Sequence, residues 1–127
     1  MNILPLESLS DNTFFTGSGP VDTEPLAIQI LKDILLENGR AQIIHGKPSA
    51  SPLRSACIVG EEAGEVMRAA LMVTAINPQE RKGGSIEFWL EEMRRELVET
   101  ASSAIRRIQL IDSGEMAQWL NAHPTQS

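Results

Sequence analysis

The chain has 127 residues, a formal net charge of −6 and a single cysteine. At this length one compact domain is expected, which buries about two thirds of the surface of its unfolded chain. The acidic balance and the lack of a basic stripe argue against a nucleic-acid partner or an anionic membrane, and one cysteine excludes a disulfide within the chain.

The N-terminal residues are predicted to be a tail or an arm. Residues 1–23 mix Ser, Asn, Gly and Pro without a sustained period. Residues 1–20 lack the basic start and apolar stretch of a signal peptide, and no run of about 18 apolar residues could span a bilayer. We expect a cytoplasmic protein with its domain at residues 24–122 and a C-terminal tail at residues 123–127.

A first helix is predicted to begin with Thr23 as its N-cap and to end at Asn38-Gly39. Pro25 falls within the first turn, where its missing N–H leaves no hydrogen bond unmade. Apolar residues at helical spacing give the segment one continuous face. They are Leu26, Ile30, Leu31, Ile34 and Leu35. Residues 40–50 are expected to form a loop or a short turn.

A second helix is predicted from Ser51-Pro52, a cap followed by a proline, to Asn77-Pro78. One face of this helix combines acidic and apolar residues. Its members are Ile58, Glu61, Glu65, Ala69 and Met72. The opposite face carries apolar or small residues at helical spacing. Its members are Leu53, Ala56, Cys57, Gly60, Ala63, Gly64, Met67, Ala70, Leu71 and Thr74. We therefore expect this helix to be covered on all sides, with Cys57 buried as a small apolar residue.

A third helix is predicted to follow a polar connection at residues 77–85, with Ser85 as its N-cap, and to run to about Ile111. We expect a buried apolar stripe along it. The members of this stripe are Ile86, Leu90, Met93, Leu97, Ala101, Ala104, Ile105, Ile108 and Ile111. Glu96 and Glu99 lie at the border of the stripe, a position that suits metal ligands.

A last short helix is predicted from Glu115 to about Ala122, with Met116, Trp119 and Leu120 as its docking face. No strand or repeat is evident. The predicted fold class is all-α: a bundle of about four helices with a central antiparallel pair of acidic helices, completed by oligomerisation.

Two acidic clusters lie in the second and third predicted helices: Glu61, Glu62 and Glu65 in one, Glu96 and Glu99 in the other. Residues three or four apart share a helix face, so each cluster projects carboxylates in a common direction. If the helices pack antiparallel, each close pair of carboxylates repels by roughly 2–4 kcal/mol at an effective dielectric near 20. A bound cation removes this penalty, and oxygen ligands favour Mg²⁺ or Mn²⁺. The alternative is a solvated acidic face without a ligand.

The segments EEAGEVMRAA and ELVETASSAIRR resemble the MazG-like, all-α nucleoside triphosphate pyrophosphatase superfamily, whose pattern is EExxE followed by ExxD. The resemblance covers roughly residues 29–109. It implies a homodimer or homotetramer that uses Mg²⁺ to hydrolyse a nucleoside triphosphate to the monophosphate and pyrophosphate. It also implies that Glu62, Glu65 and Glu96 bind the metal, while Glu61 joins them or positions the attacking water as a base. Glu99 stands where the family usually has an aspartate ligand.

Cationic residues are expected to hold the polyphosphate. Arg106 is the first candidate because it lies two turns beyond Glu99 on nearly the same sector of the helix. Arg68, three residues after Glu65, is the second. Lys47 and Arg54 are further candidates near the start of the second helix. For each of these, the alternative is an ordinary solvated surface side chain.

The aromatic and histidine residues have simpler interpretations. Trp89 either stacks on a nucleobase or packs in the core or against a neighbouring subunit, and the second role is favoured. His45 and His123 have no partner at zinc-ligand spacing, so both are predicted to be non-ligands.

Two functions without turnover remain open. Glu99 in place of aspartate, followed by Thr100-Ala101-Ser102, favours a catalytically silent MazG-like module that binds metal or nucleotide and acts through protein association. A plain four-helix interaction protein without a ligand is a third interpretation.

Overall fold

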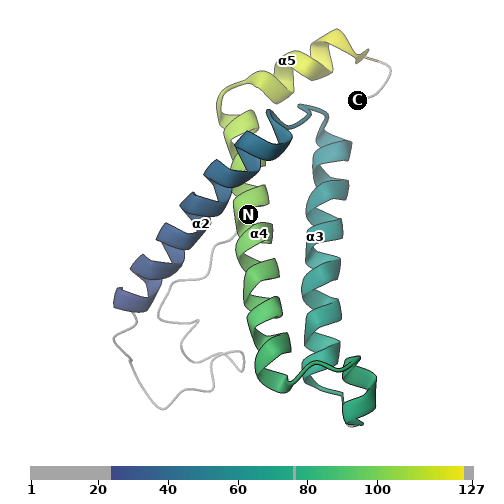
Figure 1. Ribbon diagram of the computed structural model, residues 1–127. Helices are drawn as coiled ribbons and strands as arrows, with labels where there is room; N and C mark the ends of the chain where they lie inside the picture. The colour runs from purple at the N-terminus through teal and green to yellow at the C-terminus, as the bar shows by residue number, and fades with distance from the viewer. Residues whose placement is uncertain (1–23, 76, 125–127) are drawn as a thin grey trace, which may run out of the picture.

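The computed structural model describes residues 24–75 and 77–124, and Figure 1 shows their arrangement as an α-helical bundle. The helices are α2 (Glu24–His45), α3 (Pro52–Val73), the short 3-10 turn η1 (Pro78–Arg81), α4 (Ile86–Asp112) and α5 (Glu115–Ala122). These residues contain no strand, so the predicted all-α fold is confirmed. The predicted tail at residues 1–23, the Thr23 cap and residues 125–127 lie outside the described residues.

Helices α3 and α4 form an antiparallel pair, as predicted for the two acidic helices, and α4 lies between α3 and α2 (Figure 1). Helix α2 crosses α4 obliquely, and α5 lies across the end of the bundle where α2 ends and α3 begins. Within the described part of the chain, no helix has the length and hydropathy needed to cross a membrane.

Helix α2 extends further than predicted. Asn38-Gly39 does not end it, and the helix continues through most of the expected loop to His45. Ala41 is buried, so packing offsets the roughly 1 kcal/mol that an interior glycine costs. Gly46 ends the helix instead, with a left-handed φ of 69° and its N–H donating to Gln42 O at 2.9 Å.

Helix α3 begins as predicted but ends early. Ser51 is its N-cap, and the Ser51 hydroxyl accepts a hydrogen bond from Arg54 N at 3.3 Å. The helix ends at Val73, before the predicted Asn77-Pro78 stop. Asn77 begins η1 instead, because its Oδ1 accepts a hydrogen bond from Gln79 N at 3.1 Å. The other predicted helix starts, Ser85 as N-cap of α4 and Glu115 of α5, are confirmed.

The turn between α3 and α4 is fixed by two side chains. Arg81 donates through Nε to Met72 O at 3.2 Å and through Nη2 to Ala75 O at 2.8 Å. Trp89 is buried, and its indole Nε1 donates to Arg81 O at 2.8 Å. Trp89 is therefore a packing residue within its own chain, the role that the sequence favoured.

Gly84 is needed because Trp89 packs directly against its backbone. A Cβ at residue 84 would overlap Trp89 Nε1 and lie 2.7 Å from Phe88 Cδ1. We expect Gly84→Ala to lower the free energy of unfolding by about 1–3 kcal/mol, measured by urea denaturation. Gly39→Ala is the control, since no atom lies within 4 Å of a Cβ there, and it should raise stability by about 0.5–1 kcal/mol. A Gly84→Ala variant as stable as the wild type would contradict this packing.

The interior of the single chain is more polar than predicted. Glu96, Ser102, Ser103 and Arg107 are buried on α4. The predicted buried stripe of α4 is wrong for most of its members. Ile86, Leu90, Leu97, Ile108 and Ile111 are exposed. The helical period identified residues that share a face, but that face turns away from α3 and α2.

The small and apolar face of α3 is also exposed in the single chain. Leu53 is 74% exposed, and Met67 and Leu71 are each 61% exposed. Cys57 is a free, exposed cysteine, so its predicted burial is wrong for the isolated chain. Among the described residues, seventeen large apolar side chains are exposed and only five apolar residues are buried. Exposed apolar surface of this extent is typical of interaction surfaces.

Candidate metal centre

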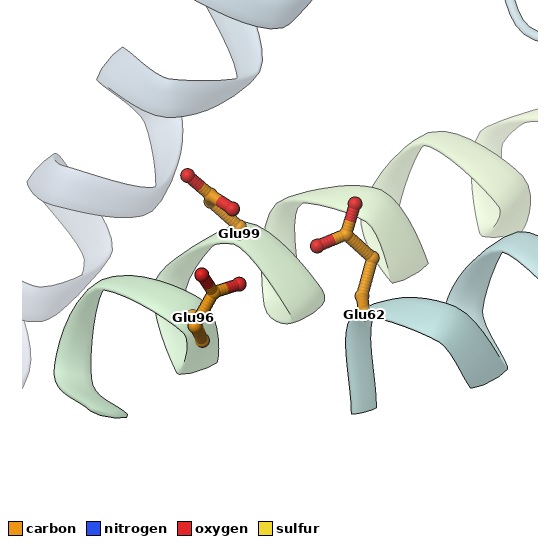
Figure 2. A group of neighbouring side chains, drawn as sticks. All are labelled: Glu62, Glu96 and Glu99. Atoms are coloured by element: carbon orange, nitrogen blue, oxygen red, sulfur yellow. The ribbon is translucent and has the colours of Figure 1, made fainter. Parts of the chain in front are cut away.

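Glu62 of α3 and Glu96 and Glu99 of α4 form an acidic cluster. Each residue offers a carboxylate oxygen, and these oxygens all lie within 4.8 Å of one another. Figure 2 shows the three side chains converging from the two facing helices. Glu96 is 9% exposed, while Glu62 and Glu99 are half-buried. The antiparallel packing of α3 and α4 therefore brings one residue of the first acidic motif against both residues of the second.

The electrostatics of this cluster disfavour three bare charges. Burial raises the pKa of Glu96, and the neighbouring Glu99 charge raises that pKa further. Burial is also the main cause of the raised pKa of Glu62, followed by repulsion from Glu99. Oxygen atoms bound to one Mg²⁺ at about 2.1 Å lie roughly 3–4 Å apart. The three carboxylates could therefore hold a hard divalent cation once their oxygens, now within 4.8 Å of one another, move slightly closer together.

Arg95 supplies part of the opposing charge. Its Nη2 lies 2.9 Å from Glu96 Oε1, and its Nη1 lies 2.9 Å from Glu99 Oε1. The same guanidinium also pairs with Glu92 at 2.7 Å. Because this one guanidinium is shared among Glu92, Glu96 and Glu99, the cluster keeps a net negative charge, which a divalent ion would reduce. Arg95 was not among the predicted site residues, although it lies at i, i+4 spacing from Glu99.

Glu61 and Glu65 lie apart from this cluster. Glu61 is exposed, since it is rotated by about 100° around α3 from Glu62. Glu65 is 52% exposed and lies 3.6 Å from Arg68 Nη1. Glu65 does line a small cavity of about 160 Å³ together with Glu96. The assignments of Glu65 as a ligand and Glu61 as a base therefore stay predictions.

Three of the four predicted phosphate-binding residues share one cavity. Lys47, Arg54 and Arg106 line a cavity of about 700 Å³ that Glu62 also borders. Arg106 is held by Ser102 Oγ at 2.7 Å and by Asn38 Oδ1 at 3.2 Å. The cluster of carboxylates therefore lies beside a basic cavity.

Arg68 lies elsewhere, beside the turn between α3 and α4. Its guanidinium carbon is 5.9 Å from the centre of the Trp89 ring. His45 borders the basic cavity, whereas the ring of His123 stacks on Trp119 with centroids 4.1 Å apart. The basic cavity also contains Arg107, which the sequence analysis missed because charged residues in helices are usually solvated. The only sequence signal was its position between apolar residues in the segment SSAIRRIQL.

In the metal-free protein, we expect the contribution of Glu62 and Glu96 to the free energy of unfolding to decrease as pH rises. Both pKa values are raised above the ordinary value, so the folded chain binds these protons more tightly than the unfolded chain. This contribution is greatest below the unfolded pKa and is lost as pH rises through the folded pKa. Urea unfolding in EDTA between about pH 4 and pH 8 measures it.

The matched variant for the pH experiment is the double substitution Glu62→Gln, Glu96→Gln. It should remove this part of the pH dependence and leave the opposite dependence from Asp33, Glu37 and Glu92, whose pKa values are lowered mainly by hydrogen bonds from arginines. Identical pH profiles for the variant and the wild type would contradict the expectation.

Comparisons of the chain with protein-family models, with curated proteins and with solved structures found no match. A function for the chain is therefore inferred from the geometry of the carboxylate cluster and the basic cavity, together with the resemblance of the two acidic motifs.

Proposed function

We propose that the protein is a MazG-like nucleoside triphosphate pyrophosphatase that depends on Mg²⁺ or Mn²⁺ and removes surplus or non-standard nucleotides. It would convert a nucleoside triphosphate to the monophosphate and pyrophosphate. The observation that carries the proposal is the convergence of Glu62, Glu96 and Glu99 beside a cavity lined by basic side chains. Carboxylates for a metal and cations for phosphate are the two requirements of this chemistry.

The residues of the chain have separate tasks in this proposal. Glu62, Glu96 and Glu99 would hold the metal, with Glu65 as a further predicted ligand. Bound there, the metal would neutralise phosphate oxygens and lower the pKa of a water molecule. Glu61 stays the predicted base for the attacking water, a role that requires its exposed carboxylate to reach the cluster through a bridging water.

The basic side chains would bind and align the polyphosphate. Arg106 suits this task because Ser102 and Asn38 fix the position of its guanidinium. Lys47 and Arg54 line the same cavity, and Lys47 would have to exchange its 2.6 Å ion pair with Glu115 for phosphate. Arg68 would contact substrate from the other side of the carboxylate cluster.

The test of the proposed function is an assay of pyrophosphate release. Purified protein is incubated with a panel of standard and modified nucleoside triphosphates, with Mg²⁺, Mn²⁺ or EDTA. We expect metal-dependent release from at least one of these nucleotides and none in EDTA. Failure to release pyrophosphate from every nucleotide of the panel would overturn the proposal of an enzyme.

A second candidate function is the catalytically silent helical module. The observation that favours it is the contact of Arg95 with Glu96 and Glu99, which partly neutralises the cluster without a metal. Glu99 in place of the family aspartate favours it as well. Thermal stabilisation by metal without any pyrophosphate release would support this module.

We also propose that the chain works in the cytoplasm as a homodimer or homotetramer. An exposed free thiol at Cys57 is compatible with a reducing compartment. The large exposed apolar surface supports assembly, because a second copy would cover it.

A further inference from the structure

The basic cavity lies at the end of the bundle where α2 ends, α3 begins and α4 approaches α5, at the top of Figure 1. Its volume of about 700 Å³ falls within the range of small-molecule sites, about 300–1,000 Å³. Four of the residues that line it carry cationic groups: Lys47, Arg54, Arg106 and Arg107. Glu62 is the one acidic residue in the lining. This concentration of positive charge stands out in a chain with a net charge of −6.

Arg107 is the unusual member of this cavity. Arg107 is only 9% exposed, yet it takes part in none of the ion pairs among the described residues. Nη1 donates to Ser103 Oγ at 2.8 Å and Ser103 O at 3.2 Å. The buried Nε has no hydrogen-bond partner in the described chain. The charge of Glu62 acts in favour of the charged guanidinium, but from beyond ion-pair distance. A buried guanidinium without a direct ion pair is strongly unfavourable, because neutral oxygens replace only part of its hydration.

The other cationic side chains of the cavity do not stabilise the positive charge of Arg107. Arg106 is hydrogen-bonded to two neutral side chains, and its repulsion adds to burial in lowering the pKa of Arg107. Arg54 is exposed, and its side chain makes no hydrogen bond or ion pair with the described residues. Of the four cationic side chains, Lys47 alone has an ion pair among the described residues, with Glu115. The cavity therefore holds more positive charge than its own carboxylates balance.

We propose that this cavity is an oxyanion site that binds a di- or triphosphate group without a metal, with Arg107 as its buried anchor. Guanidinium groups are matched to phosphate because their planar N–H donors reach two oxygens at once. Glu62 borders the cavity, so the bound phosphates lie next to the carboxylate cluster. The assignment of these phosphates to a substrate triphosphate or to product pyrophosphate rests on the proposed function, whereas the anion site itself does not.

The test is calorimetric titration of the full-length protein with inorganic pyrophosphate in EDTA, followed by titration with a nucleoside triphosphate and with adenosine. We expect saturable binding of both phosphate ligands and none of adenosine. Tighter binding of the triphosphate would assign the site to substrate, and tighter binding of pyrophosphate would assign it to product. Absence of pyrophosphate binding, or tight binding of adenosine, would overturn the proposal.

Arg107→Gln and Arg54→Gln are the variants, and Lys32→Gln, at an exposed residue outside the cavity, is the control. Arg107→Gln should weaken pyrophosphate binding by about 10-fold or more, Arg54→Gln by less, and Lys32→Gln not at all. Arg107→Lys should recover part of the loss, because it restores the charge but not the planar donors. Wild-type affinity in Arg107→Gln would overturn the role of the anchor.

Thermal unfolding separates an anion anchor from a structural arginine. Without ligand, Arg107→Gln should unfold at a temperature equal to or above that of the wild type, because it removes an unpaired buried charge. A large fall in unfolding temperature, with pyrophosphate binding retained by the folded fraction, would instead assign Arg107 a structural role. Pyrophosphate binding in EDTA without any turnover of nucleotides would reject the proposed enzyme and support the anion site. Turnover without pyrophosphate binding in EDTA would support the enzyme and reject the anion site.

Discussion

Glu96→Gln is expected to reduce pyrophosphate release by about 100-fold or more, because it removes a charged ligand at nearly constant volume. Glu96 is the most buried of the three clustered carboxylates, and it is close to both Glu62 and Glu99. The same substitution should abolish the rise in unfolding temperature that Mg²⁺ or Mn²⁺ produces, since that rise depends on metal affinity for the folded state. Steady-state kinetics and thermal unfolding with and without metal measure the two effects.

Glu91→Gln is the matched control for this experiment, because Glu91 is an exposed glutamate on the same helix and outside the cluster. It should leave both turnover and the metal response unchanged. Glu65→Gln tests the remaining predicted ligand, and its effect should be smaller than that of Glu96→Gln because Glu65 is half exposed and pairs with Arg68. Wild-type turnover in Glu96→Gln would place the metal elsewhere, and equal losses in both variants would place Glu65 in the cluster.

Met67→Glu is expected to convert the proposed homo-oligomer to a monomer. Met67 is 61% exposed on α3 in the single chain, within the apolar face that also contains Leu53, Cys57 and Leu71. A second copy of the chain would bury this face, and a carboxylate placed there would lose hydration without gaining a partner. Light scattering coupled to size-exclusion chromatography measures the change in mass.

Gln79→Glu, which adds the same charge at an exposed position of η1, is the control and should keep the wild-type mass. Gly64 provides a second test of the same face. No atom of the single chain lies within 4 Å of a Cβ at Gly64, so Gly64→Ala should stabilise a monomer by about 1 kcal/mol. If a partner helix packs closely there, the substitution should instead weaken assembly. A monomeric wild type together with a stabilised Gly64→Ala would contradict the proposed dimer.

Local sequence signals predicted the helices where the cause was itself local. Ser51 and Ser85 cap α3 and α4 as expected, because a serine hydroxyl needs only the N–H groups of the next turn. The predicted end of α2 at Asn38-Gly39 is wrong, because Gly39 keeps a helical backbone and the left-handed Gly46 ends the helix instead. Ala41 lies between the two glycines and is buried, and this burial depends on packing with other parts of the chain.

The candidate site was predicted in part for the same reason. The spacing of Glu96 and Glu99 placed both on one face of a helix, and the structure brings them together with Glu62. Spacing alone did not separate Glu62 from Glu61, because adjacent residues differ by only about 100° around the axis. Arg95 and Arg107 were missed because their roles depend on contacts that their own position in the sequence does not reveal.

The sequence by itself determined that the chain is all-α, that two acidic motifs lie on consecutive helices, and that each helix has an apolar face. These properties follow from side-chain period and from capping, which act over a few residues. The tertiary structure decided which faces meet: Glu62, Glu96 and Arg107 turn inward, while the apolar faces of α3 and α4 turn outward. The sequence of a helix places side chains on all of its faces, and packing against the neighbouring helices determines which face is buried.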